Sequence, residues 1–157
     1  MRGIQAAPPR FFFSCYTGEI MTDEAFEQLV REGILAVPEK FRKLMNNVEI
    51  VIEDKPTREQ QKKLKLGKGY ALYGLYEGIP RTARGAHYSL VLPDKITIFK
   101  NAILDEAARQ SEGNGDYETT VSEIVRETVW HEIAHHFGYT EGRVREAERK
   151  RRRRKLD

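Results

Sequence analysis

Three of the four histidines in this 157-residue chain, His131, His135 and His136, lie within one six-residue stretch. The residues around them have the apolar spacing of an α-helix. Side chains four residues apart project from the same face of a helix, so His131 and His135 are expected to stand side by side. Glu132 follows His131 by about 100° around the helix axis, which places its carboxylate next to this pair. The stretch therefore predicts a helix with two imidazole rings on one face and a carboxylate beside them.

This H-E-x-x-H spacing predicts a zinc centre. Zinc accepts imidazole nitrogens, and in hydrolases with this motif the glutamate takes a proton from a water that the metal acidifies. We expect His131 and His135 to be metal ligands and Glu132 to be the catalytic general base. His136 points about 100° away from His135, so packing or support of a ligand is the more natural role for it.

A third ligand is expected, because a catalytic zinc site usually has three protein ligands and leaves a fourth position to water. Gly138 can adopt a left-handed conformation, end the helix and reverse the chain. Glu141 then follows where the chain could return beneath the histidines. The alternatives are that Glu141 is a surface residue opening a final helix, or that Glu146 or Glu148 is the third ligand.

Length and composition are those of one globular domain. No apolar run approaches the roughly 20 residues that span a bilayer, and the N-terminus lacks the apolar stretch of a signal peptide. The single cysteine, Cys15, excludes an intramolecular disulfide and suits a reducing compartment. We therefore expect a cytoplasmic protein without membrane contact. Cys15 as a metal ligand, as in a deformylase-type hydrolase, is a further alternative.

Positive charge is concentrated near the C-terminus. Residues 142–157 contain nine Lys/Arg and three Asp/Glu, whereas the rest of the chain contains 18 and 21, which together give the net charge of +3. Residues 149–155 are seven consecutive cations. Such a run predicts either salt-sensitive contact with nucleic acid or another acidic partner, or a solvated helix end whose cations suit the helix dipole.

The remaining patterns indicate an α+β domain. Thr22 is expected to cap a helix, residues 48–52 read as a strand, and residues 88–92 and 95–99 read as a β-hairpin. A capping box from Thr120 to Glu123 is expected to start the long helix that carries the motif through Phe137. We predict a core domain over residues 21–148, an N-terminal extension without clear period over residues 1–20, and a basic tail over residues 149–157.

Several segments occur in the order found in a known family. They are FEQLV (26–30), ILAVP (34–38), NVEI (47–50), LYEGIP (75–80), PDKITIF (93–99) and HEIAHHFG (131–138). In these segments the chain resembles the compact bacterial zincin-like metallopeptidases. The resemblance implies a minimal zincin: a small mixed or antiparallel sheet packed with helices, with the motif helix near the C-terminus beneath a cleft and an edge strand along its upper wall. It also implies zinc binding by His131 and His135, Glu132 as the base, and Glu141 at the acidic position after the glycine. No methionine follows Met45, so the methionine turn of metzincins is absent.

Two functional hypotheses follow from the motif. The first is hydrolysis of peptide bonds in a peptide or protein substrate that lies extended along an edge strand. The second is a catalytically silent, zinc-stabilised binding protein with the same ligands. The sequence does not indicate an oligomeric state.

Overall fold

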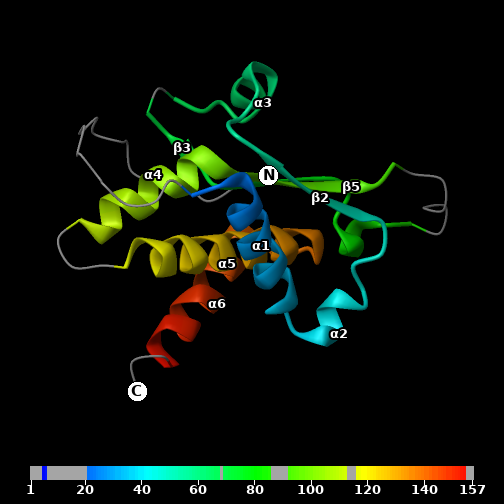
Figure 1. Cartoon of the computed structure of the whole chain (residues 1–157). Helices are drawn as coiled ribbons and strands as arrows, with labels where there is room; N and C mark the ends of the chain where they lie inside the picture. The colour runs from blue at the N-terminus through cyan, green and yellow to red at the C-terminus, as the bar shows by residue number, and fades with distance from the viewer. Residues whose placement is uncertain (1–4, 7–20, 68, 86–91, 113–115, 155–157) are drawn as a thin grey trace.

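The computed structural model describes residues 5–6, 21–67, 69–85, 92–112 and 116–154, which form an α+β fold (Figure 1). Its helices are α1 (Asp23–Leu35), α2 (Glu39–Arg42), α3 (Arg58–Lys63), α4 (Lys100–Ser111), α5 (Tyr117–His136), α6 (Glu141–Arg154) and the 3₁₀ turn η1 (Arg81–Ala83). Its strands are β1 (Gln5–Ala6), β2 (Val48–Glu53), β3 (Ala71–Leu72), β4 (Gly74–Glu77) and β5 (Asp94–Phe99). The expected fold class is confirmed, with the motif helix α5 near the C-terminus.

A three-stranded mixed sheet lies at the centre of the domain in the order β2-β5-β4. β2 runs parallel to β5, with Val48 opposite Asp94, and β4 runs antiparallel to β5, with Tyr76 opposite Ile96. β1 and β3 form a separate antiparallel pair. The predicted strand at 48–52 is thus confirmed, and among the described strands β2 and β4 are the two edge strands of the central sheet.

The predicted β-hairpin is wrong in its pairing. β5 pairs with β2 along one edge and with β4 along the other, so its partners differ from the one that the hairpin prediction gave it. Residues 88–91 themselves lie outside the described residues. Asp94, which the hairpin prediction placed in a turn, is the first residue of β5. Local alternation identified this strand, but its partners come from distant segments.

The two faces of the sheet are covered by different elements. Tyr76, Ile96 and Ile98 point into the main core, which they share with α1, α4 and α5. Leu75 and Phe99, one residue out of phase, point to the opposite face and pack with leucines that follow α3. Figure 1 accordingly shows α3 on the side of the sheet away from α1 and α5.

Helix α1 packs against the middle of the motif helix. Thr22 caps α1 as predicted, because its side chain accepts a hydrogen bond from the backbone N–H of Ala25 at 3.1 Å. Phe26 and Val30 are buried in the main core together with Val125 and Val129 of α5. This packing fixes one side of α5.

Helix α5 begins earlier than the capping box predicts. Its N-cap is Asp116, whose carboxylate accepts from the backbone N–H of Glu118 at 3.1 Å. Thr120 lies inside the helix, and its hydroxyl donates to the Asp116 carbonyl at 2.8 Å. Glu123 is exposed, whereas residues 131–136 are all buried. The helix therefore runs from a solvated start into the interior, where the motif lies.

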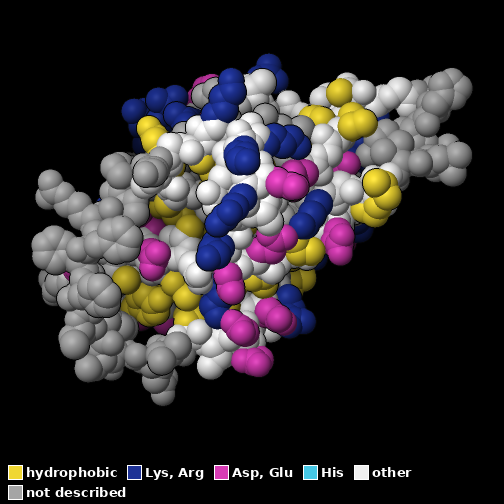
Figure 2. Space-filling view, turned by 90° about the horizontal axis from the view of Figure 1, so that it is seen from above, with side chains coloured by type: hydrophobic (Ala, Val, Ile, Leu, Met, Phe, Trp, Pro, Cys, Tyr) yellow, Lys and Arg dark blue, Asp and Glu magenta, His cyan; other side chains and the backbone are white. Residues whose placement is uncertain are grey.

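The face of the molecule on the α3 side carries charges of both signs (Figure 2). Figure 2, which looks onto the α3 side, shows Lys/Arg side chains intermingled with Asp/Glu side chains. Within the described part of the chain, no helix combines the length and the apolar character needed to cross a membrane.

Candidate metal centre

The turn after the motif helix reverses the chain in two residues. Gly138 has a φ of +84°, the left-handed conformation that glycine adopts most readily. Its backbone N–H donates to the His135 carbonyl at 2.9 Å, and the N–H of Tyr139 donates to the Ala134 carbonyl at 3.0 Å, which is the Schellman pattern. This turn directs the start of α6 back towards the histidines.

The reversal brings Glu141 onto the two histidines of the motif. Oε2 of Glu141 lies 3.3 Å from Nε2 of His131 and 3.4 Å from Nε2 of His135. The three side chains each offer one ligand atom, and these atoms lie within 4.8 Å of one another. Glu141 is also the first residue of α6, as the alternative of a helix start predicts. It lies beside the two histidines as well, so starting the helix does not remove it from the cluster.

The Nδ1 atoms of both rings, here called the outer nitrogens, already have hydrogen-bond partners. Nδ1 of His131 lies 2.9 Å from Oε1 of Glu148, and Nδ1 of His135 lies 3.0 Å from the carbonyl oxygen of Tyr139. A carboxylate and a carbonyl can only accept, so each Nδ1 carries the hydrogen. In a neutral ring this leaves Nε2 as a lone pair directed at Glu141.

This arrangement fits a metal ion. Nε2 of His135 is buried without a hydrogen-bond partner of normal geometry among the described residues. Two imidazole lone pairs and a carboxylate oxygen repel one another unless a positive charge lies between them. Two imidazole nitrogens and one carboxylate oxygen are a donor set that suits zinc. The residues therefore fit the ion that the motif predicts.

The surroundings shift the pKa values of the two histidines in opposite directions. Burial opposes protonation of His131, but its hydrogen bond to Glu148 and the charges of Glu132, Glu148 and Glu141 outweigh this and raise its pKa. Burial and the neighbouring His131 lower the pKa of His135. His131 is thus the ring on which carboxylates converge.

Glu132 is enclosed against the edge strand. Its residue is 1% exposed, and neither carboxylate oxygen has a hydrogen bond of normal geometry within the described part. Burial raises its pKa to about 7, although His131 and the nearby backbone N–H of Tyr76 act in the opposite direction. A buried carboxylate left without hydrogen bonds is costly, so this position is one that structural stability alone does not favour.

Gly74 is what lets β4 approach Glu132. A Cβ built on Gly74 would lie 2.7 Å from Cγ and 2.9 Å from Oε1 of Glu132. Any other residue at this position would force the strand, the Glu132 side chain or the Thr128 side chain to shift. The sequence analysis missed Gly74, although its place in an aromatic, glycine-rich segment is a signal that could have drawn attention to it.

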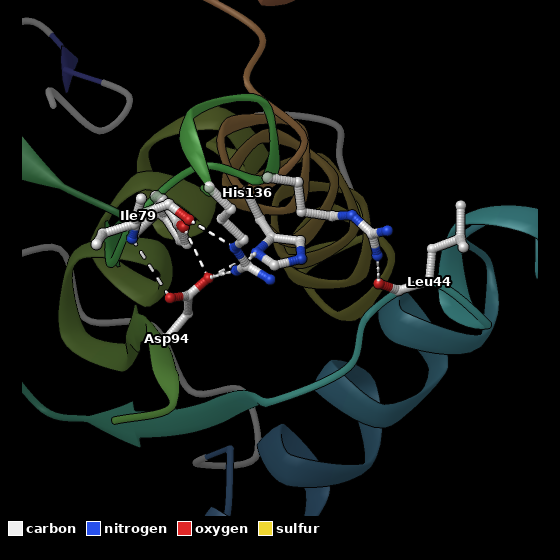
Figure 3. Close-up of polar contacts among 7 residues, drawn as sticks. Leu44, Ile79, Asp94 and His136 are labelled. Atoms are coloured by element: carbon white, nitrogen blue, oxygen red, sulfur yellow. Dashed lines mark hydrogen bonds and ion pairs between the residues drawn. The ribbon is translucent and has the colours of Figure 1, made fainter. Parts of the chain in front are cut away.

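His136 belongs to a separate buried cluster centred on Asp94 (Figure 3). The Asp94 carboxylate, 2% exposed, accepts from the Tyr76 hydroxyl at 2.8 Å, lies 2.9 Å from Nδ1 of His136 and forms an ion pair with Arg84. It also accepts from the backbone N–H of Ile79 at 3.4 Å. Asp94 therefore ties the edge strand β4, the start of β5 and the end of α5 together.

The segment that follows β4 packs against the turn at Gly138. Arg81 donates to the Leu44 carbonyl, and its guanidinium lies 5.7 Å from the centroid of the Phe137 ring. A Cβ on Gly138 would lie 2.2 Å from Oγ1 of Thr82. This close approach is a second reason, besides its φ, for glycine at position 138.

The other acidic and thiol alternatives lie elsewhere. Glu146 is exposed and forms an ion pair with Lys150 at 2.8 Å. Glu148 contacts the outer nitrogen of His131 instead of joining Glu141. Cys15 lies outside the described residues.

Comparison with known proteins supports the same family as the motif. A comparison with curated proteins found no match. The family model described as zincin-like metallopeptidase matches residues 45–151, which include the central sheet, the motif helix and most of α6. Since this match covers more than half of the chain, the protein belongs to the zincin-like metallopeptidase family.

Proposed function

We propose that this chain is a zinc-dependent peptidase in which His131, His135 and Glu141 hold the ion and Glu132 is the general base. Family membership supports a peptidase-type function. The observation that carries the proposal is the convergence of three acceptor atoms on one point, within 4.8 Å of one another. A zinc ion there would supply Lewis acidity, polarising a peptide carbonyl and lowering the pKa of a water towards about 7.

The protein's own contribution is to position the reacting groups. Glu148 and the Tyr139 carbonyl fix the two rings, so that both Nε2 atoms face the same point. Glu132 is available to accept a proton because its carboxylate oxygens make no competing hydrogen bond of normal geometry with the described residues. It would take the proton from the attacking water and return it to the leaving amine.

The substrate we propose is an extended peptide or protein segment. β4 is the terminal strand of the central sheet, and an extended chain can add to such an edge through main-chain hydrogen bonds. Gly74 places this strand directly against Glu132. A peptide aligned with β4 would therefore pass the proposed base.

The function is tested by removing and restoring the metal. Protein stripped with a chelator should bind one zinc per chain and then cleave members of a peptide library, with new termini detected by mass spectrometry. Glu141→Ala should bind zinc much more weakly and recover little cleavage. Zinc binding with no cleavage of any peptide would favour the catalytically silent binding protein, and failure to bind zinc would refute both functions.

Glu148 is expected to strengthen the site without touching the ion. Its carboxylate orients His131, and loss of such a partner typically weakens metal affinity about 10–100-fold. We expect Glu148→Ala to show this loss in a competition titration with a zinc-sensitive dye. Glu148→Gln should lose less, because its amide oxygen can still accept from Nδ1.

Glu146→Gln is the matched control, because Glu146 lies on the same helix and is exposed. Its zinc affinity should equal that of the unmodified chain. If Glu148→Ala also binds zinc with unchanged affinity, the contact with His131 does not support the site.

A further inference from the structure

The far end of α6 carries a dense positive charge. α6 continues to Arg154, and residues 149–155 are all Lys or Arg. Arg149, Lys150 and Arg153 are exposed. In Figure 1 this end of α6, drawn in red, lies away from the central sheet. The charge is therefore presented on a helix that extends from the body of the domain.

The acids on α6 are engaged near its start. Glu141 forms an ion pair with Arg145 at 2.9 Å and faces the histidines, and Glu148 contacts His131. Glu146 pairs with Lys150. Among the described residues, neither Arg149 nor Arg153 forms an ion pair within 4.0 Å. The acidic side chains of α6 thus leave Arg149 and Arg153 without an ion-pair partner among the described residues.

Such a run disfavours its own helix. Arg149 and Lys150 each have like charges both three and four residues further on within α6, and like-charge pairs at these spacings destabilise a helix. Cations at a helix C-terminus gain from the dipole only within the last turn. A ligand that lays negative charges along the run would remove this repulsion.

We propose that residues 149–155 bind the phosphate backbone of a nucleic acid. A helix rises about 1.5 Å per residue, and duplex DNA carries one charge per about 1.7 Å, so the two charge densities are similar. Five of the seven residues are arginines, whose planar guanidinium groups bind phosphate with two parallel hydrogen bonds. The run consists only of Lys and Arg, and contacts of such side chains with phosphates carry no sequence information. We therefore expect this phosphate binding to be independent of sequence.

The rest of the sequence carries no excess of positive charge. Outside residues 142–157 the chain has 18 Lys/Arg against 21 Asp/Glu. The face seen in Figure 2 mixes both signs. The helix end is therefore the part that attracts a polyanion, and this attraction does not depend on peptidase activity.

The test is fluorescence anisotropy with the full chain, loaded with zinc, and short labelled duplex DNA or single-stranded RNA of random sequence. We expect binding to at least one of them, with an affinity that falls steeply as salt increases. The fourfold variant Arg149→Gln, Arg151→Gln, Arg152→Gln and Arg153→Gln should bind at least about 10-fold more weakly. Its salt slope should be shallower by up to about 4, because each phosphate contact contributes about 1.

The matched control removes four cations elsewhere, with Arg31→Gln, Lys43→Gln, Lys62→Gln and Lys63→Gln, and should bind almost as the unmodified chain does. Zinc content should be the same in all three proteins. Neither variant should lose helical circular dichroism, and any change in the helix variant should be a gain, because four like charges are removed from α6. Equal loss in both variants, or no loss in the helix variant, would overturn the proposal. So would binding of labelled poly-glutamate alone, which would point to an acidic protein partner.

Discussion

Replacement of Glu132 with glutamine is expected to lower peptide hydrolysis about 10²–10⁴-fold, the usual contribution of a general base. The amide has the shape of the carboxylate but cannot take a proton from water. Zinc content should remain at one per chain, since the proposed ligands are untouched. The measurements are turnover of a peptide found in the library and metal analysis of the purified variant.

The same substitution is not expected to weaken the fold. Glu132 is buried without a hydrogen bond of normal geometry within the described residues, and its burial disfavours the charged form. A neutral amide there should leave the free energy of unfolding of the metal-free protein unchanged or raise it. A loss of activity caused by misfolding would instead appear as a lower unfolding free energy.

Glu123→Gln provides the comparison, because Glu123 lies exposed on the same helix. It should retain both activity and zinc. If Glu132→Gln cleaves peptides at the rate of the unmodified chain, the proposed mechanism is wrong. If Glu132→Gln loses its zinc, the role of Glu132 is to hold the site together.

The clustering of His131, His135 and Glu141 was predictable because these residues are close in sequence. His131 and His135 are one helical turn apart. Gly138 can end the helix because a residue without a Cβ readily adopts the left-handed conformation, and Glu141 follows three residues later. These features depend on helix geometry and one turn, both of which are read from local spacing. The cap at Thr22 was predictable for the same reason.

The support around the cluster was not predictable, because it depends on contacts between distant segments. Glu148 was considered as a ligand, but its contact with the outer nitrogen of His131 depends on the direction in which α6 leaves the turn. Gly74 of β4 lies against Glu132 of α5, and Asp94 contacts His136, which is 42 residues further along the chain. The hairpin prediction failed for the same reason, since β5 pairs with two strands from elsewhere in the chain.

Replacement of Gly138 with alanine is expected to be the most destabilising single change at the turn. An L-residue in the left-handed conformation costs roughly 1–2 kcal/mol. The new Cβ would also lie 2.2 Å from Oγ1 and 2.8 Å from Cγ2 of Thr82, and overpacking of this kind typically costs about 1–3 kcal/mol. The sum, about 2–5 kcal/mol, is a large part of the roughly 5–15 kcal/mol that stabilises a domain.

Urea unfolding of the zinc-free protein measures this loss, because bound zinc would itself add stability. Thr82→Ala removes both of the atoms that the new Cβ would meet most closely. The double variant Gly138→Ala with Thr82→Ala should therefore recover the steric part of the loss and keep the backbone part. A double-mutant cycle separates the two contributions.

Gly142→Ala is the control for the backbone. A Cβ at Gly142 would meet no heavy atom within 4 Å, and alanine in a helix is favoured over glycine by roughly 0.5–1 kcal/mol. This variant should be slightly more stable than the unmodified chain. Gly138→Ala should also bind zinc more weakly, because the turn places the Tyr139 carbonyl on His135 and carries Glu141 to the histidines. If Gly138→Ala were as well tolerated as Gly142→Ala, neither the left-handed turn nor the packing of Thr82 against it could be what brings Glu141 to the site.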